Sequence, residues 1–563
     1  MGGFASQRPP ERRPSGRRRA GGPGRRSRGG TGVARSPSTS VRRRRLGGVS
    51  GRASEDLPAA GAILLVVVVA ELHQRHLMIA RDRAWLVAGL AAVAASLGVG
   101  FVVWRKGGRS PRPAGARVAA ARPGAAEQGW ASRRELRPLF VKAPPGDRIV
   151  LGAHGRRLLA AEANQSVLLT GPTQSGKTSG LAIPAITEWA GPVVATSVKS
   201  DLVRHTIAER RLKGVVQLYD PTGVTGLAGA GWSPLTTSGT WTGAKRMASA
   251  LCSMARSDGG MDDAGFWYSS AEKLLAPLLL AAASAGASMT DVVRWIDDEE
   301  MHEPLLALEL VGVPDALRAA RTSFGREERQ RSSVFATAET VVAAFSDPSV
   351  AASSRHQAID PASLVDGSAR TLYCCAPARE QERLRPVFVA LIRHVIDAAF
   401  ERAAMLGRPL DPPLLVVLDE AANIAPLAEL DTIVSTAAGH GIQLVTVWQD
   451  FAQIEARYGR RWSTIVNNHR AKVLCPGTAD PLTLDHVSSL IGDDERTDES
   501  RTVGDDGRWS RTETVSLRRV VPSAMLRRVA PGEAVVVYGA LPPARVRLRA
   551  FRGGPSRTRH RPG

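Results

Sequence analysis

One loop constrains the fold of this chain more than any other feature. Residues 166 to 186 read SVLLTGPTQSGKTSGLAIPAI, and positions 171 to 178 fit the pattern GxxxxGK followed by Ser or Thr. An apolar run precedes the loop and a helix-like pattern follows it, which is the context that this pattern requires. Backbone N–H groups in such loops, together with the N-terminus of the following helix, bind phosphate. The sequence therefore predicts a nucleoside triphosphate site, and its flanks disfavour a chance glycine turn.

The loop residues have separate expected roles. Lys177 can reach the β- and γ-phosphates of ATP, and the Thr178 hydroxyl can ligate Mg²⁺. The backbone of the other positions can surround the phosphates. The expected cofactor-binding set is therefore the whole motif: Gly171, Pro172, Thr173, Gln174, Ser175, Gly176, Lys177 and Thr178.

A loop of this kind needs a second, acidic site. The stretch PPLLVVLDEAAN contains an apolar run that reads as a buried parallel strand and ends in Asp419 and Glu420. Asp419 can hold Mg²⁺, and Glu420 can orient and deprotonate the attacking water. The alternative is an exposed Asp-Glu pair that caps a helix. The position of the run in the expected sheet favours the catalytic interpretation.

Two further candidates depend on weaker patterns. Gln449 ends the apolar strand in GIQLVTVWQD and could sense the γ-phosphate or position water, although a glutamine at a strand end is often a turn residue. Lys199 in ATSVKSDL could lie near phosphate. Ser200 or Asp201 as a helix N-cap would explain much of the same pattern.

Strand and helix patterns alternate on both sides of the loop. SVLLT, PVVAT and GVVQLYD read as strands, with helices expected at 176–190 and 201–212. Such a βαβαβ series predicts an α/β fold with a parallel sheet covered on both faces. Strand signals disappear from about 240 to 345, where helices are expected. They return in RTLYCCA, LLVVLDE, IQLVTVWQD and AKVLCPG, and the polar residues 493–515 predict a mobile loop.

Charge is concentrated at the two ends of the chain. The net charge is +22, with 14 Arg and one acid in residues 1–50, seven Arg and no acid in 545–563, and about +2 for the rest. We expect a disordered Arg-rich tail at 1–55 and a basic tail at 551–563. Because the body is nearly neutral, the overall charge is weak evidence for nucleic-acid binding.

A membrane anchor is expected between the first tail and the sheet. Residues 84–104, AWLVAGLAAVAASLGVGFVVW, carry no charge and are long enough for a bilayer core of roughly 30 Å. Trp85 and Trp104 stand at its ends and basic residues follow, which predicts a cytoplasmic C-terminal side. With this span alone, the Arg-rich N-terminal segment would lie outside the cell. A marginal second span at 57–70 would keep that segment inside, and translation from Met78 would remove it from the protein. A buried globular helix is the alternative.

The expected domain order follows from these segments. A membrane anchor at 56–106 and a linker at 107–135 precede an NTPase domain at 136–240 and 346–550, which an all-α insertion at 241–345 interrupts. The four cysteines form no CxxC pattern, so neither a disulfide nor a zinc site is predicted. Cys374 and Cys375 are expected on opposite faces of one strand.

Several motifs in a fixed order resemble one family. They are GPTQSGKTSGLAIPAI, VVATSVKSDLVRHT, GVVQLYDPTG with GWSPL, LLVVLDEAANIAPLAELDTIVSTAAGHGIQLVTVWQD, and VNNHRAKVLCPG. Together they resemble the type IV coupling proteins, the TraG/TraD conjugation ATPases, over about residues 140 to 550. SVKSDL and the block from DEAANI to VTVWQD are far more specific than the phosphate loop alone.

The resemblance implies a fold, partners and roles. It implies a homohexameric RecA-like P-loop ATPase anchored in the inner or plasma membrane, with cytoplasmic soluble domains and an all-α domain. Such proteins use ATP and Mg²⁺ to hand a relaxase-bound single DNA strand to a type IV secretion channel. Carried over by position, Lys177, Glu420 and Gln449 are catalytic, whereas Thr178 and Asp419 hold the metal. Residues 440–500 resemble the part that recognises a relaxosome partner.

Two other functions stay open. A pump of the FtsK or HerA type would act on double-stranded DNA, and the sequence does not reveal strandedness. A docking platform would bind nucleotide without pumping, although the intact Lys177, Asp419 and Glu420 argue against it.

The chain departs from the family pattern before the strand that ends in Gln449. Coupling ATPases of this type commonly place an arginine finger there, but the stretch STAAGHGIQ contains no Arg. His440 lies in the stretch and is mostly uncharged near neutral pH. We expect a downstream arginine on the same face of the sheet to act across a subunit boundary. The candidates are Arg457, Arg460, Arg461 and Arg470, and Arg470 is preferred.

Overall fold

The structure is a computed structural model that describes residues 129–198, 200–253, 262–355, 357–503, 509–549 and 551. The expected Arg-rich tail, membrane anchor and Lys199 lie outside these residues, as do most of the linker and most of the C-terminal basic tail. Among the helices within these ranges, none combines the length and apolarity that a membrane crossing needs.

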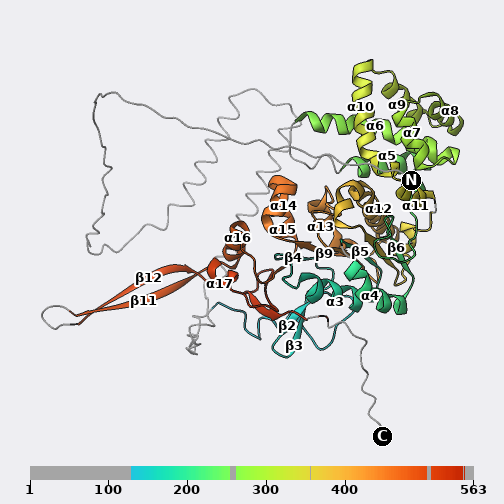
Figure 1. The fold of residues 1–563 in the computed structure, drawn as a ribbon. Coiled ribbons are helices and arrows are strands. Elements are labelled where there is room, and N and C mark those ends of the chain that lie inside the picture. Colours follow the sequence, from blue (N-terminus) through green and yellow to red (C-terminus); the bar gives the residue numbers. More distant parts are fainter. Residues whose placement is uncertain are drawn as a thin grey trace, which may run out of the picture. The chain divides into compact units, whose positions relative to one another are not determined.

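A mixed sheet, with 12 strands among the described residues, forms the centre of the fold (Figure 1). Parallel strands make up one side in the order β10–β4–β9–β8–β5–β7–β6. Their bounds are β4 Val167–Thr170, β5 Val193–Ser197, β6 Val216–Tyr219, β7 Thr371–Cys375, β8 Leu414–Leu418, β9 Ile442–Trp448 and β10 Ala471–Leu474. All except β6 are buried along their whole length, as expected for parallel strands covered on both faces.

The remaining strands are antiparallel, so the prediction of a parallel sheet is wrong at this edge. They continue from β10 in the order β13, β14, β2, β3, β1. The bounds are β13 Glu533–Tyr538, β14 Ala544–Arg547, β2 Val150–His154, β3 Arg157–Ala160 and β1 Phe140–Val141. Short connections join β2 to β3 and β13 to β14. Because a parallel crossover needs a dozen or more residues, these pairs can only be antiparallel.

Helices cover both faces of the parallel strands and create two cores (Figure 1). They are α3 Ile183–Glu188, which follows a π-helical turn η2 Thr178–Ala182, α4 Ser200–Lys213, α12 Gln381–Leu406, α13 Leu430–Ala437, α14 Phe451–Tyr458, α15 Trp462–Asn468, α16 Pro481–Ile491 and α17 Ser523–Arg527. Successive strand residues enter different cores. Cys374 packs in one and Cys375 in the other, as predicted.

Only helices, α-helical or 3-10, occur in the described residues between β6 and β7, which agrees with the lost strand signals. The α-helices are α5 Trp241–Cys252, α6 Asp262–Ala285, α7 Met289–Asp297, α8 His302–Val311, α9 Pro314–Phe324, α10 Glu328–Val342 and α11 Pro348–Arg355. Helix α6 packs against α5, α8, α9 and α10, and its Leu274, Leu278 and Leu279 are fully buried. The group is therefore packed around α6, whose buried residues are continuous with the core on one face of the sheet.

The prediction of a mobile loop at 493–515 is wrong. Strands β11 Asp493–Val503 and β12 Trp509–Arg519 form a separate two-stranded antiparallel sheet (Figure 1). On β12, Val515 and Leu517 are exposed. Most residues of the two strands are polar and show no apolar alternation, which is the signal that identifies a half-buried strand in a sequence.

Arg210 ties α4 to the sheet from inside the core. Its side chain is fully buried and donates to Thr371 Oγ1 at 2.7 Å, Trp189 O at 2.5 Å and Gly191 O at 2.8 Å. Burial lowers the pKa of Arg210 to about 10. Two of these bonds provide donors for the carbonyls of Trp189, at the end of α3, and of Gly191, before β5. Neither carbonyl lies within a strand.

We expect Arg210→Met to lower the free energy of unfolding by about 3–5 kcal/mol, because it removes the buried donor to Gly191 O and Thr371 Oγ1. Chemical denaturation followed by circular dichroism measures this change. The matched control is Arg211→Met, at the exposed next position, which should stay within about 0.5 kcal/mol of the parent. Equal stability of the two variants would contradict the assignment.

Candidate nucleotide-binding site

Strand order brings the predicted site residues to one edge of the sheet. Strand β9 lies between β4 and β8, with Thr170 opposite Trp448 and Leu418 opposite Thr446. The three strands are parallel, so the segments that follow them meet at their carboxyl ends, where ligands bind in open α/β sheets. These segments begin at Gly171, Asp419 and Gln449.

The loop after β4 requires glycine at two positions for different reasons. A Cβ on Gly171 would lie 2.7 Å from Cys475 Cβ and 2.8 Å from Ser175 Oγ, so the neighbouring strand and the loop leave no room for one. Gly176 has a φ of +87°, a conformation that residues with side chains rarely adopt. Gln174 also has a positive φ, 63°. The loop is therefore compact, and its backbone adopts unfavourable conformations at two positions.

Lys177 turns back over this loop. Its Nζ donates to the carbonyl oxygens of Gly171 and, at 2.7 Å, of Pro172. Burial lowers the pKa of the Lys177 ammonium, and the Asp419 and Glu420 carboxylates nearby oppose that shift. The cation thus lies inside the loop, where the phosphates of a nucleotide would be bound.

Thr178 and Asp419 meet at the start of η2. The Thr178 hydroxyl donates to Asp419 Oδ2 at 3.2 Å and lies 3.4 Å from Oδ1. Asp419 is 9% exposed, and Thr196 Oγ1 donates to its backbone oxygen at 3.3 Å. A hydroxyl and a carboxylate in contact fit Mg²⁺, which prefers hard oxygen ligands and one or two carboxylates beside substrate phosphates.

Glu420 is held in a strained conformation beside Asp419. Its φ is 57°, and a non-glycine residue in this region costs about 1–3 kcal/mol, a strain that is common at functional sites. Asn423 Nδ2 donates to Glu420 Oε2 at 3.2 Å, and Arg385 Nε of α12 donates to the Asn423 carbonyl at 3.0 Å. Sequence reasoning missed Asn423, whose only signal is its position three residues after Glu420.

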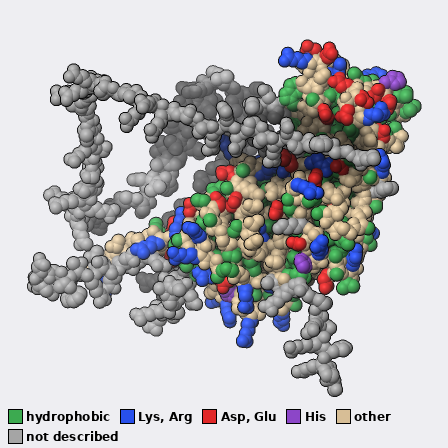
Figure 2. Space-filling view, in the orientation of Figure 1, with side chains coloured by type: hydrophobic (Ala, Val, Ile, Leu, Met, Phe, Trp, Pro, Cys, Tyr) green, Lys and Arg blue, Asp and Glu red, His purple; other side chains and the backbone are tan. Residues whose placement is uncertain are grey.

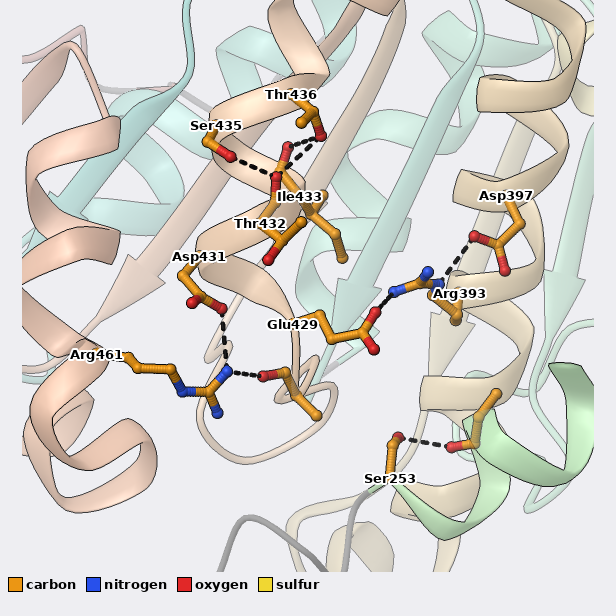
Figure 3. A network of polar contacts seen from close by, with 12 residues as sticks. Ser253, Arg393, Asp397, Glu429, Asp431, Thr432, Ile433, Ser435, Thr436 and Arg461 are labelled. Carbon is orange, nitrogen blue, oxygen red and sulfur yellow. Dashed lines mark hydrogen bonds and ion pairs between the residues drawn. The ribbon is translucent and has the colours of Figure 1, made fainter. Parts of the chain in front are cut away.

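Arginines also hold the end of the segment that follows Glu420 (Figure 3). Arg461 donates to Ala428 O at 2.8 Å and to Asp431 Oδ1 at 3.1 Å. Arg393 of α12 pairs with Glu429 and, at 2.9 Å, with Asp397. The segment between β8 and α13 is therefore fixed to α12 at one side and to the 3-10 turn Gly459–Arg461 at the other.

A cavity of about 300 Å³ lies over the phosphate loop. Residues 173–179 line it together with Asp419, Glu420 and a wall from α4 that includes Asp201 and His205. A larger cavity of about 370 Å³ between α5 and α12 contains no loop residue. The smaller cavity is the one that joins the loop to the carboxylates, so we assign the nucleotide to it.

Gln449 adjoins the loop through its backbone. Its carbonyl accepts from Gly171 N at 3.1 Å and from Thr170 Oγ1 at 3.3 Å. The side chain is exposed and is not among the residues that line the cavity. Its role as a γ-phosphate sensor stays a prediction.

Arg470 lies at the end of β10 opposite the phosphate loop, so its expected position is wrong, whereas its action across a subunit boundary stays a prediction. It directly precedes β10, whose first residue pairs with Val167 at the beginning of β4. The loop follows the other end of β4. Arg470 Nε instead pairs with Glu162 Oε2 at 3.0 Å, and its guanidinium lies 5.6 Å from the centre of the Tyr538 ring.

The family model for type IV secretory system conjugative DNA transfer matches residues 131–544. The chain belongs to this family. Among curated members, a conjugal transfer protein TraG of Escherichia coli is 26% identical over 355 residues, which cover 58% of this chain and 55% of that protein. A second TraG from the same organism is 25% identical over 355 residues. This family member thus spans about half the length of the curated relatives it matches.

Solved structures share the fold. The bacterial conjugative coupling protein TrwBdeltaN70 in its unbound form has a TM-score of 0.58 at 19% identity, covering 74% of this chain and 92% of that one. The plasmid coupling protein TrwB in complex with ADP and Mg²⁺ has a TM-score of 0.57 at 19% identity, covering 76% and 94%. This family member therefore shares the α/β fold of these conjugative coupling proteins.

Gly171→Ala tests the close approach at the loop. The added methyl must displace Cys475 or Ser175, so we expect at least a tenfold loss of ATP affinity, measured by isothermal titration calorimetry. Gly439→Ala is the matched control, because a Cβ there meets nothing within 4 Å. Unchanged affinity in Gly171→Ala would show that the loop does not bind the phosphates.

Proposed function

We propose that this protein is a membrane-anchored ATPase that couples DNA to a type IV secretion channel. The contact between the Thr178 hydroxyl and the buried Asp419 carboxylate, beneath a complete phosphate loop, carries the proposal. A metal-binding pair placed beside a phosphate-binding ring is the arrangement that NTP hydrolysis needs. Family membership supplies the link to conjugative DNA transfer.

Each residue of the site has a proposed role in hydrolysis. Lys177 leaves the carbonyls of Gly171 and Pro172 and binds the β- and γ-phosphates. Thr178 and Asp419 hold Mg²⁺, which supplies neutralising charge. Glu420 takes a proton from the water that attacks the γ-phosphorus, and the bond to the β-phosphate oxygen breaks to release ADP.

A cluster of exposed arginines could bind the negatively charged partner. Residues 129–160 contain seven Lys and Arg and two acids, and Lys and Arg side chains gather over β2 and β3 (Figure 2). Arg156 and Arg157 form the end of that hairpin, and a Cβ on Gly155 there would meet Arg133 Nη2 at 3.3 Å. A basic surface of this kind binds phosphates with little sequence preference.

The remaining parts of the proposal depend on the family and the sequence. We propose a homohexamer in the inner or plasma membrane with cytoplasmic soluble domains, and a single DNA strand delivered by a relaxase. The NTPase domain is proposed to comprise 136–240 and 346–550, with the all-α insertion at 241–345. A double-stranded DNA pump of the FtsK or HerA type is the alternative. Comparing the stimulation of ATP turnover by single- and double-stranded DNA distinguishes the two.

Two substitutions separate binding from chemistry. Lys177→Ala should abolish ATP hydrolysis and DNA transfer while the protein still fractionates with membranes, since the change is remote from the apolar segment. Glu420→Gln should bind ATP normally and hydrolyse it at least a hundredfold more slowly, because the amide retains the shape and loses the base. Equilibrium binding and phosphate release are the measurements. ATP turnover at the wild-type rate in Lys177→Ala would refute the assignment of Lys177 to the nucleotide site. If the unmutated protein showed no ATP turnover, the docking-platform alternative would be favoured.

An arginine acting across subunits has a separate test. Arg460 is exposed and follows Gly459 in the turn that holds the segment after Glu420, so we expect it to supply the charge to a neighbouring site. Such a cation contributes about 10³ to 10⁵ in turnover. Mixtures of Lys177→Ala and Arg460→Ala subunits should therefore regain activity that neither has alone. Mixtures with Arg470→Ala test the other candidate in the same way, and normal activity of Arg460→Ala alone would exclude Arg460.

A further inference from the structure

The backbone on both sides of Glu420 is attached to the sheet. Thr196 Oγ1 of β5 donates to the carbonyl of Asp419 at 3.3 Å, and Ala421 N donates to Val447 O of β9 at 3.1 Å. Between these two bonds Glu420 adopts its left-handed conformation, with φ 57°. The sheet therefore determines where the Glu420 side chain begins, but these backbone bonds do not determine how its carboxylate is turned.

One donor holds the Glu420 carboxylate. Asn423 Nδ2 donates to Glu420 Oε2 at 3.2 Å, and among the residues that the structure describes no second hydrogen bond reaches this carboxylate. The backbone N–H of Asn423 also donates to the Glu420 carbonyl at 2.9 Å, so the turn brings the amide to the carboxylate. With Oε2 engaged by Asn423, Oε1 is the oxygen that stays available to a water molecule.

Asn423 itself lies outside the nucleotide cavity. Glu420 is among the residues that line the cavity over the phosphate loop, and Asn423 is not. Asn423 can therefore influence hydrolysis only through the group that it holds. Orientation matters for a base of this kind, because a misplacement of about 1 Å can cost about 10²-fold in rate.

Helix α12 holds the turn that carries Asn423. Arg385 Nε donates to the carbonyl of Asn423 at 3.0 Å, which fixes the backbone from which the amide projects. Two residues earlier on the helix, Arg383 pairs with Asp347 at 3.0 Å and with Glu380 at 2.9 Å. The beginning of α12 is thus itself attached to the segment before α11, so Arg385 extends from a fixed position.

We propose that Asn423 is the positioning residue of the base Glu420, and that Arg385 holds Asn423 in place from α12. The inference rests on the proposed hydrolysis of ATP and adds two residues to it. Without either hydrogen bond, the Glu420 carboxylate can turn away from the water that attacks the γ-phosphorus. The phosphate loop and the metal-binding pair are untouched by this change. Turnover therefore depends on Asn423, and ATP affinity does not.

The experiment measures kcat for ATP hydrolysis and, by calorimetry, the dissociation constant of ATP, using the full chain. We expect Asn423→Ala to lower kcat by about tenfold to a hundredfold, with ATP affinity unchanged. Asn423→Asp keeps the shape, but an ionised carboxylate cannot donate, so its kcat should fall at least as far. Arg385→Met should lower kcat in the same direction.

The matched control is Asn468→Ala. Asn468 Nδ2 also donates at 3.3 Å, but to the backbone oxygen of Asp431, and kcat should stay at the parental value. A second comparison uses Glu420→Gln as the background. If Asn423 acts only through the Glu420 carboxylate, adding Asn423→Ala should change the residual turnover by less than about twofold, because the two effects are not additive.

Several outcomes would reject the positioning role. Parental kcat in Asn423→Ala or in Asn423→Asp would show that the donated hydrogen bond is not needed. A loss of ATP affinity as large as the loss of kcat, or a full further loss in the Glu420→Gln background, would show that Asn423 only supports the fold. Parental turnover in Glu420→Gln alone is a different failure, because it would reject the proposed base itself.

Discussion

The hydrogen bond between Thr178 and Asp419 is the contact on which the rest of the site depends. It joins the first turn after β4 to the end of β8 across the intervening β9. The two groups can meet only if the three parallel strands end at the same level, and the strand register provides this. The same register also brings three other groups to this edge of the sheet: Lys177, Glu420 and the backbone of Gln449. The apolar strands thus determine the position of the polar chemistry.

The segment after Asp419 shows how a strained residue is retained. Glu420 adopts a left-handed conformation, which would relax if the following residues were free to move. Asn423 binds its carboxylate, Arg385 holds Asn423 from α12, and Arg461 holds the same segment further along. Helix α12 also packs against α5, the first helix of the all-α group. A shift of Glu420 would therefore be transmitted to α12, which contacts both regions.

The antiparallel edge of the sheet contributes to the site from outside the parallel core. Strands β13 and β14 extend the sheet beyond β10 and direct Leu548 and Phe551 back to η2 and Ser179. Gly180 is required for the contact with Leu548, so the loop helix and the C-terminal segment are matched in shape. In this arrangement the last described residues of the chain contact the helix that follows the phosphate loop.

Local patterns determined the parallel strands, the phosphate loop and the acidic pair, because each is encoded in a few consecutive residues. The helices between β6 and β7 were predictable for the same reason. The strands β11 and β12 were not, since their mostly polar residues show no apolar period. The position of Arg470 was predicted wrongly because it depends on how β10 pairs with β4. Arg470 precedes β10, whereas the phosphate loop follows β4, and the parallel pairing places them at opposite ends of these strands. Asn423 and Phe551 acquire their contacts only when distant segments meet. The sequence alone thus determined which groups could bind a nucleotide. The tertiary structure decided which of them lie together, because packing and strand register depend on contacts between residues far apart in the chain.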